Sequence, residues 1–141
     1  MELADFYYSD KAKELKIDNK PNDVMTERCK LFLFHAVEPL ETLFSPKVII
    51  HHSGYRCPKL NDAVKGQTFS QHLRGNAWDF HVEGMTVEDA YRVILHSSLR
   101  WDQCILEGKA GHQWIHFSWN TDLEQGKQRM QALEIPNPHT K

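Results

Sequence analysis

The order and periodicity of the sequence predict an α+β protein with a small antiparallel sheet and flanking helices. One long segment has apolar residues at helical spacing, whereas several later segments have the short, alternating pattern of strands. Two of these strands are separated by a short turn, which favours antiparallel pairing. A chain of 141 residues is long enough for one domain and too short for two ordinary ones, so we expect a single domain over residues 1–141.

The composition is that of an ordinary globular protein without strong charge. Hydrophobic residues make up 40% and charged residues 26% of the chain, which argues against disordered, collagen-like and membrane-spanning classes. The 17 basic and 19 acidic residues give a net charge of −2, so nucleic acid is not an expected partner. The cysteines Cys29, Cys57 and Cys104 are far apart and odd in number, which indicates neither a disulfide framework nor a cysteine zinc site.

The first long helix is predicted between Asp23, its N-cap, and the pair Ser45-Pro46, which ends it. The residues before it are mainly polar, with a turn at Lys16–Asn22. Pro39 falls inside the helical pattern and predicts a kink. The apolar stripe of this helix consists of Val24, Cys29, Leu31, Phe32, Phe34, Val37, Leu40 and Leu43. His35 lies on or beside the stripe, and we interpret it as a core or surface histidine rather than a ligand.

The remaining predicted elements are short strands and short helices. In chain order they are a strand over Lys47–His51, a loop over Ser53–Cys57, a helical turn over Pro58–Lys65, a polar loop over Gly66–Gly75, a strand over Asn76–Val82, a helix over Thr86–Ser98, strands over Trp101–Glu107 and Gln113–Trp119, and a helix over Leu123–Leu133. Thr86 is the predicted N-cap of its helix. The turn Gly108–His112 joins its two flanking strands into a hairpin.

Two of the predicted strands carry a side chain able to bind metal on the face turned away from the core. Alternate residues of a strand share one face, so Asp79 lies opposite an apolar face, and His116 does the same in the later strand. The apolar faces consist of Trp78, Phe80 and Val82 in one strand and of Ile115, Phe117 and Trp119 in the other. The opposite faces add Ala77 and His81 to Asp79, and Trp114 and Ser118 to His116.

With His72, in the loop before the first of these strands, Asp79 and His116 would form a site of two nitrogens and one oxygen. Zinc binds such mixed donors, and three protein ligands leave a fourth position for water, as in catalytic zinc sites. Calcium and magnesium instead prefer oxygen ligands throughout. Spacing alone does not distinguish this site from three scattered surface groups.

Five stretches of the sequence together resemble one known family. They are Asn19-Lys20-Pro21, Ser53-Gly54-Tyr55-Arg56, Leu60-Asn61, Ser70-Gln71-His72-Leu73-Arg74-Gly75-Asn76-Ala77-Trp78-Asp79-Phe80 and Trp114-Ile115-His116. The pattern is similar to that of the zinc D-Ala-D-Ala carboxypeptidases, and most similar to their short, phage-type, endolysin-like branch. The resemblance covers residues 5–120 and leaves the C-terminal tail, residues 121–141, without a counterpart.

The resemblance implies the hedgehog/DD-peptidase fold and a zinc ion held by His72, Asp79 and His116. It further implies hydrolysis of amide bonds in the stem peptides of bacterial peptidoglycan, either as a carboxypeptidase that removes a terminal D-Ala or as an endolysin-type endopeptidase. Bound zinc would make a water nucleophilic near neutral pH and would polarise the scissile carbonyl.

The general base is the point at which the sequence departs from the best-known members of this family. They have an acid three residues before the last histidine, where this chain has Gln113, and an amide cannot accept a proton as a base. Glu107 is the leading candidate because pairing with Trp114 across the hairpin would place it on the same face as His116. The two Cα atoms would then be about 7 Å apart. Short phage-like relatives often have an acid at this point. His112 is the second candidate.

Two further residues are candidates for substrate binding. Arg56 follows a predicted strand, and its guanidinium could bind a peptide carboxylate or stabilise an oxyanion, although a surface ion pair is the alternative. Ser70 could bind substrate or only shape its loop. Trp114 could form a wall of the cleft, and His81 is expected at the rim of the site.

Other functions remain open from the sequence alone. One alternative is a metal-binding module on the same fold without catalytic activity, which the departure at Gln113 keeps possible. A His-Asn-His type nuclease is a weaker alternative, suggested by His51-His52, Asn61 and His72 but disfavoured by the low charge. A hydrolase using Cys57 is weaker still, since no partner spacing supports it.

Partners and location are expectations from the same resemblance. We expect peptidoglycan peptides as the partner, no nucleic acid, no membrane insertion and a monomer. The first residues lack a signal peptide, whereas wall peptides lie outside the cytoplasm. We therefore expect a protein made in the cytoplasm that reaches the wall by phage release or in a virion.

Overall fold

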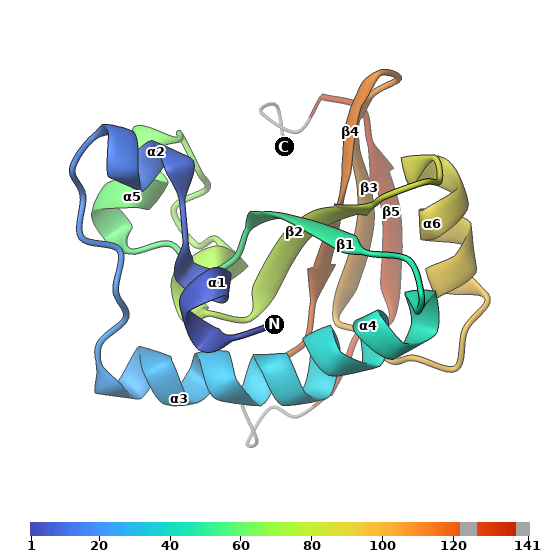
Figure 1. Cartoon of the computed structure of the whole chain (residues 1–141), viewed down its shortest axis with the longest axis horizontal. Helices are drawn as coiled ribbons and strands as arrows, with labels where there is room; N and C mark the ends of the chain where they lie inside the picture. The colour runs from blue at the N-terminus through green and yellow to red at the C-terminus, as the bar shows by residue number, and fades with distance from the viewer. Residues whose placement is uncertain (122–126, 138–141) are drawn as a thin grey trace.

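The computed structural model describes residues 1–121 and 127–137, and a five-stranded sheet forms its centre (Figure 1). The strands are β1 (Ile49–Ser53), β2 (Ala77–Val82), β3 (Gln103–Lys109), β4 (His112–Ser118) and β5 (Gln131–Ile135). Their order in the sheet is β1-β2-β4-β3-β5, and only the β3–β5 pair is parallel. The predicted α+β class with a mainly antiparallel sheet is confirmed.

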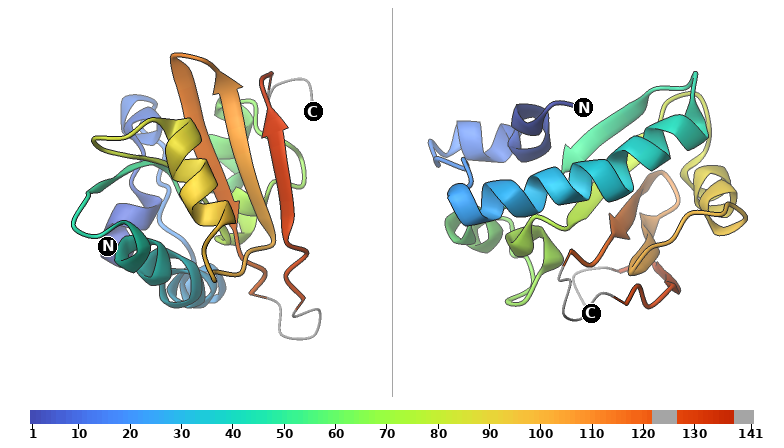
Figure 2. Two further views of the ribbon diagram at one scale, coloured as in Figure 1. Left: turned by 90° about the vertical axis from the view of Figure 1, so that its right-hand side faces the viewer. Right: turned by 90° about the horizontal axis from the view of Figure 1, so that it is seen from below.

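The helices are short except for one rod that crosses the molecule (Figure 2). They are α1 (Leu3–Tyr7), α2 (Asp10–Glu14), α3 (Asp23–Phe32), the π-helical segment η1 (Leu33–Val37), α4 (Glu38–Phe44), α5 (Pro58–Ala63), the 3-10 helix η2 (Gln71–Arg74) and α6 (Val87–Leu95). No helix in the described ranges is long and apolar enough to cross a membrane.

The rod formed by α3, η1 and α4 corresponds to the long predicted helix, with two corrections. Its N-cap is Asn22 rather than Asp23, because the Asn22 side chain accepts a hydrogen bond from the backbone N–H of Met25. The predicted stripe is wrong at Val24, Leu31 and Phe34, which are 63%, 40% and 64% exposed. They lie between the buried positions of the rod, which are Cys29, Phe32, Ala36, Val37, Leu40 and Phe44.

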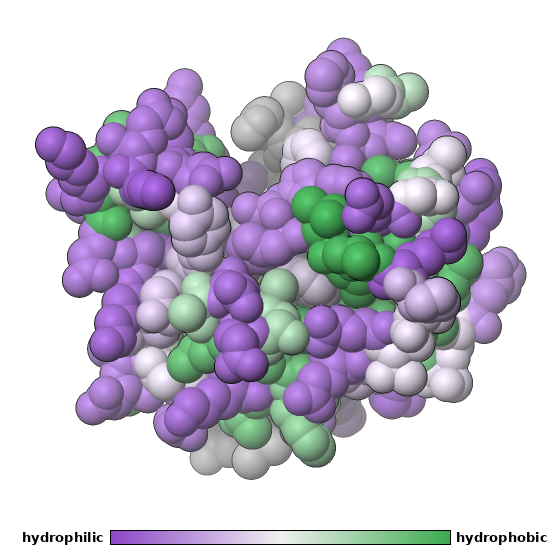
Figure 3. Space-filling view, viewed as in Figure 1, coloured by the Kyte–Doolittle hydropathy of each residue, from purple (hydrophilic) through white to green (hydrophobic). Residues whose placement is uncertain are grey.

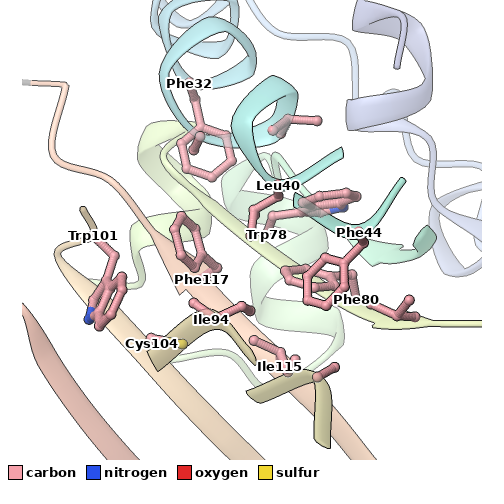
Figure 4. Packing of buried hydrophobic residues seen from close by; sticks show 14 of the residues in the cluster. Phe32, Leu40, Phe44, Trp78, Phe80, Ile94, Trp101, Cys104, Ile115 and Phe117 are labelled. Carbon is pink, nitrogen blue, oxygen red and sulfur yellow. The ribbon is translucent and has the colours of Figure 1, made fainter. Parts of the chain in front are cut away.

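The core lies between this rod, α6 and one face of the sheet (Figure 4). It includes the predicted apolar residues of β2 and β4, with Trp78, Phe80, Ile115 and Phe117 at most 1% exposed. The hydroxyl of Thr86 accepts from the N–H of Asp89 at 3.0 Å, so the predicted N-cap of α6 is confirmed. One face of the sheet is therefore filled by the core, and the opposite face is left for the site.

The N-terminal 22 residues are more ordered than the sequence indicated. They contain α1 and α2, and α1 contributes the fully buried Phe6. The backbone carbonyl of Phe6 accepts from Tyr55 N at 3.2 Å, and the Asn19 side chain binds the carbonyls of Tyr7 and Tyr55. Helices of five residues are too short to show a helical period, but here they hold the loop that follows β1.

The end of the chain also differs from the prediction. The helix expected over Leu123–Leu133 is wrong at its C-terminal end, where β5 begins at Gln131, and residues 122–126 lie outside the described residues. β5 pairs in parallel with β3 from Gln103–Gln131 to Glu107–Ile135. A strand whose residues are mostly exposed has little apolar alternation, so its pairing is set by the neighbouring strand rather than by a local pattern.

Candidate metal centre

The structure brings together the three side chains that the sequence singled out as metal ligands, which we call the ligand cluster (His72, Asp79 and His116). Asp79 and His116 are direct register partners in β2 and β4. His72 reaches them from η2, so that Nε2 of His72 lies 3.2 Å from Oδ2 of Asp79. Nδ1 of His116 lies 3.0 Å from Oδ1 of Asp79. One ligand atom from each residue lies within 4.8 Å of the others.

The turn that presents His72 is built by the residues on either side of it. The Ser70 hydroxyl accepts from the backbone N–H of His72 at 3.2 Å and caps the first turn of η2. Gly75 ends η2 with a φ of +69°, a conformation that glycine adopts without strain. A Cβ at this position would also lie 2.8 Å from Sγ of Cys29 in α3. The tight turn therefore depends on Gly75.

Each imidazole of the ligand cluster has one nitrogen bound to the protein and one facing Asp79. Nδ1 of His72 donates to the carbonyl of Gly54 at 2.7 Å, which leaves Nε2 facing the carboxylate. Nε2 of His116 lies 3.2 Å from Oε1 of Gln71, which leaves Nδ1 facing the carboxylate. A hydrogen bond to the second nitrogen orients the ring and selects its tautomer, as is usual for histidines that bind metals.

The electrostatics of the cluster favour the forms that bind metal. Burial lowers the pKa of His72, so its ring is neutral at pH 7 and keeps a lone pair. Burial acts to raise the pKa of Asp79, but His72 and His116 outweigh it and hold that pKa well below its usual range. Zinc binds nitrogen and oxygen ligands at about 2.0–2.2 Å, so facing atoms some 3 Å apart can share one ion. The three residues therefore fit a zinc ion.

The ligand cluster lies in the wall of a cavity of about 480 Å³. This cavity is also lined by four other residues considered in the sequence, which are Arg56, Ser70, Glu107 and Trp114. The segment from Val64 to Gln67, after α5, also lines it. Figure 3 shows a hollow between the lobe that carries α2 and α5 and the tip of the β3–β4 hairpin. Residues far apart in the sequence thus share one solvent-accessible site.

Glu107 lies in this cavity and His112 does not. The hairpin register pairs Glu107 with Trp114, as the placement of Glu107 beside His116 required. The Glu107 side chain is 5% exposed, and its Oε1 lies 3.8 Å from Nδ1 of His116. His112 is exposed beside the hairpin turn, and with Gln113 it lines a separate cavity of about 750 Å³. The geometry favours Glu107 over His112 as a proton acceptor beside the ligand cluster.

Arg56 is directed into the same cavity. One of its terminal nitrogens donates to the Ser70 hydroxyl at 3.4 Å, and its Nε is buried without a hydrogen-bond partner among the residues that the structure describes. Burial lowers the pKa of Arg56, and the carboxylates of Asp79 and Glu107 oppose that effect. A buried guanidinium with an unused donor is suited to bind an anionic or developing oxyanionic group.

The other histidines in the described ranges and the remaining candidates lie outside the ligand cluster. His81 contacts His52 and lines the second cavity, while His51 accepts a hydrogen bond from Nε1 of Trp78 at 2.9 Å. Asn61 donates to the carbonyl of Gln67 at 2.9 Å, and Cys57 is not among the residues that line the ligand cavity. His35 is exposed and stacks on Trp119, in agreement with its interpretation as a residue that is not a ligand.

Sequence reasoning missed Gln71, which contacts the ligand cluster, and Asp102, which contacts Gln71. Gln71 contacts His116, and its amide nitrogen donates to Oδ2 of Asp102 at 2.9 Å. The only feature of the sequence that could have pointed to Gln71 was its position beside the predicted ligand His72. Asp102 gave no signal, because 31 residues separate it from Gln71.

Comparison with known proteins agrees with this geometry. The model of the family described as Peptidase M15 matches residues 2–118 of the chain, which include all three residues of the ligand cluster together with Arg56, Ser70 and Glu107. A search of curated proteins finds no match.

Proposed function

This chain belongs to the peptidase M15 family of zinc-dependent peptidases, and we propose that it hydrolyses peptide bonds with a zinc ion held by His72, Asp79 and His116. The observation that carries the proposal is the ligand cluster itself, with three mixed donors converging in the wall of an open cavity. Bound zinc supplies Lewis acidity, which polarises a carbonyl and makes water a better nucleophile.

Glu107 performs the proton transfer in this proposal. Its carboxylate takes a proton from the water whose oxygen attacks the carbonyl carbon, and it returns that proton to the nitrogen of the leaving amine as the carbon–nitrogen bond breaks. Support comes from its place in the cavity, 3.8 Å from His116, and from its burial. The buried position keeps the carboxylate close to the reacting atoms and limits competing water.

Arg56 binds the negative charge of the substrate. Its guanidinium lines the cavity together with Glu107 and the ligand cluster, which suits either a terminal carboxylate of the peptide or the oxyanion formed at the scissile carbonyl. The Ser70 hydroxyl joins this group to the ligand cluster, because it accepts from Arg56 and also from the backbone N–H of His72. Ser70 therefore positions both the anion-binding group and one ligand.

We propose stem peptides of bacterial peptidoglycan as the substrate. The support is the resemblance to D-Ala-D-Ala carboxypeptidases and phage-type endolysins, together with an arginine suited to a peptide carboxylate. Trp114 lines both the ligand cavity and the neighbouring cavity, so an extended peptide could continue from one into the other. A carboxypeptidase would release free D-Ala, whereas an endopeptidase would release longer fragments, and mass spectrometry of digested peptidoglycan separates the two.

The experiment that tests the proposed function combines metal analysis with peptidoglycan digestion. We expect one zinc per purified chain and loss of both zinc and hydrolysis in His116→Ala. His35→Ala is the matched control, because His35 is exposed and lies outside the ligand cavity. Full zinc content in His116→Ala would overturn the ligand assignment. Zinc binding without hydrolysis of any wall peptide would instead favour a metal-binding module without catalytic activity.

A further inference from the structure

We propose that Arg129 and Asp102 position the ring of His116 through the side chain of Gln71, so that a segment outside the family match helps to build the zinc site. The inference rests on the proposed zinc site. The family match ends at residue 118, and Arg129 lies beyond it, just before β5. Asp102 directly precedes β3. Neither residue touches the ligand cluster, so each acts as a positioning residue.

A continuous series of hydrogen bonds joins Arg129 to His116. The Nε and Nη2 of Arg129 donate to the two carboxylate oxygens of Asp102 at 2.9 and 2.8 Å. The amide nitrogen of Gln71 donates to Oδ2 of Asp102 at 2.9 Å. The amide oxygen of Gln71 lies 3.2 Å from Nε2 of His116. The two ends of the Gln71 amide thus face different partners.

The direction of these hydrogen bonds is determined by the two ends of the series. Arg129 can only donate, and the ionised carboxylate of Asp102 can only accept. Gln71 must therefore turn its NH₂ group toward Asp102 and its carbonyl oxygen toward His116. A carbonyl oxygen only accepts, so Nε2 of His116 carries the proton. This hydrogen bond occupies Nε2 and leaves Nδ1, the atom that faces Asp79, as the nitrogen available to a metal ion.

The surroundings of Asp102 keep the series in place. Its side chain is 7% exposed, whereas that of Arg129 is 56% exposed. The backbone N–H of Arg129 also donates to Asp102, at 3.1 Å, and Gln131 N donates to the Asp102 carbonyl at 3.0 Å. The pairing of β5 with β3 therefore holds Arg129 over Asp102. A buried carboxylate that loses its guanidinium partner is less able to hold the Gln71 amide in one orientation.

The first test measures the hydrogen bond of His116 Nε2 and the zinc affinity in Gln71→Met and Arg129→Met. Nitrogen NMR of the metal-free protein should show a hydrogen-bonded N–H at Nε2 of His116 in the wild type and a lost or weakened hydrogen bond at this nitrogen in both variants. Zinc affinity, measured by competition with a chelating dye, should fall about 10–100-fold, the usual cost of losing a partner behind a ligating histidine. Arg92→Met is the control, because Arg92 makes an exposed ion pair with Asp89 on α6.

A second test exchanges the amide and the carboxylate at positions 71 and 102, so that position 71 can again accept from His116. Gln71→Glu alone places two carboxylates together and should lower zinc affinity. The double variant Gln71→Glu/Asp102→Asn lets the new glutamate accept from both His116 and the new asparagine, so most of the affinity should return. A role of Gln71 and Asp102 in folding alone would not predict this rescue.

Wild-type affinity and an unchanged hydrogen bond at Nε2 of His116 in both Gln71→Met and Arg129→Met, or no rescue in the double variant, would overturn the inference. Failure of the proposed zinc site would look different, because the wild type would then bind no zinc, and failure of the proposed hydrolysis would leave zinc binding intact. The hydrogen bond at Nε2 of His116 in the metal-free protein would report on the series in either case.

Discussion

Two groups of histidines lie along the same side of β2 in the described part of the chain, and only one of them has three side chains that could hold a metal ion. The ligand cluster contains Asp79, whereas the second group consists of His81, two residues further along β2, and His52 of β1. The rings of His52 and His81 meet edge to face with centroids 4.8 Å apart. Within the described ranges, only the ligand cluster joins three potential ligands.

The difference lies in the partners of the rings rather than in the number of histidines. In the ligand cluster a carboxylate lies between two imidazoles, and the second nitrogen of each ring is held, by the Gly54 carbonyl or by Gln71. The nitrogens of His52 and His81 face each other instead, and charge on His81 adds to burial in lowering the pKa of His52. In this protein a carboxylate between two oriented rings distinguishes the ligand cluster from the two neighbouring histidines.

The largest expected effect comes from removing the carboxylate of the ligand cluster. Asp79→Ala should abolish stoichiometric zinc binding and hydrolysis, because it removes a ligand and the charge that attracts the cation. His81→Ala is the matched variant in the second group and should keep both. Metal analysis of the two purified proteins makes the comparison, and loss of zinc in His81→Ala alone would show that the second group holds the metal.

The next largest effect concerns proton transfer beside the ligand cluster. Glu107→Gln should keep zinc, since no proposed ligand is removed, and should lower the rate by about 10²–10⁴-fold, the usual scale for a lost general base. His112→Ala, in the cavity shared with His52 and His81, should have a nearly normal rate. The measurement is the rate of wall-peptide hydrolysis together with zinc content, and the opposite pattern would assign the base to His112.

A smaller effect is expected for the anion-binding group. Arg56→Lys keeps the charge but loses the planar fork of donors, so turnover should fall roughly tenfold while the melting temperature stays nearly unchanged. Steady-state kinetics and thermal unfolding of the same preparation test this expectation. A large loss of stability with normal turnover would instead show that Arg56 serves the fold through its contact with Ser70.

The smallest effect is a pH dependence of stability in the metal-free protein. Burial lowers the pKa of His72 below its ordinary value of 6.5, so the unfolded chain binds more protons than the native chain between these two values. The contribution of His72 to the free energy of unfolding is therefore complete above about pH 6.5. It decreases as the pH falls from 6.5 toward the lower pKa of His72 in the folded protein. Urea unfolding with a chelator present measures it.

The two histidine groups should differ in this pH dependence as well. His72→Gln should flatten the acid side of the profile more than His52→Gln, because His72 is 2% exposed whereas the burial of His52 is only partial. Equal profiles for the two variants would show that burial of His72 does not control the acid sensitivity.

The strands that carry the site were predictable because their information is local. The alternation in β2 and β4 placed Asp79 and His116 opposite the core, and the short turn between β3 and β4 predicted the hairpin that sets Glu107 against Trp114. Alternate side chains of a strand point to opposite faces whatever the rest of the chain does. The α+β class, the cap at Thr86 and the orientation of Asp79 and His116 follow from such patterns, whereas the choice of His72 as the third ligand rested on the family resemblance.

The elements that hold the site in place depended on the tertiary structure. The helices α1 and α2 show no period in five residues each, and β5 is mainly exposed, so neither segment has a pattern that distinguishes it. The series from Arg129 through Asp102 and Gln71 to His116 joins four segments of the chain. Polar contacts of this kind leave no periodic trace in a sequence, because they are set by the distance and direction between groups that only the packed sheet brings together.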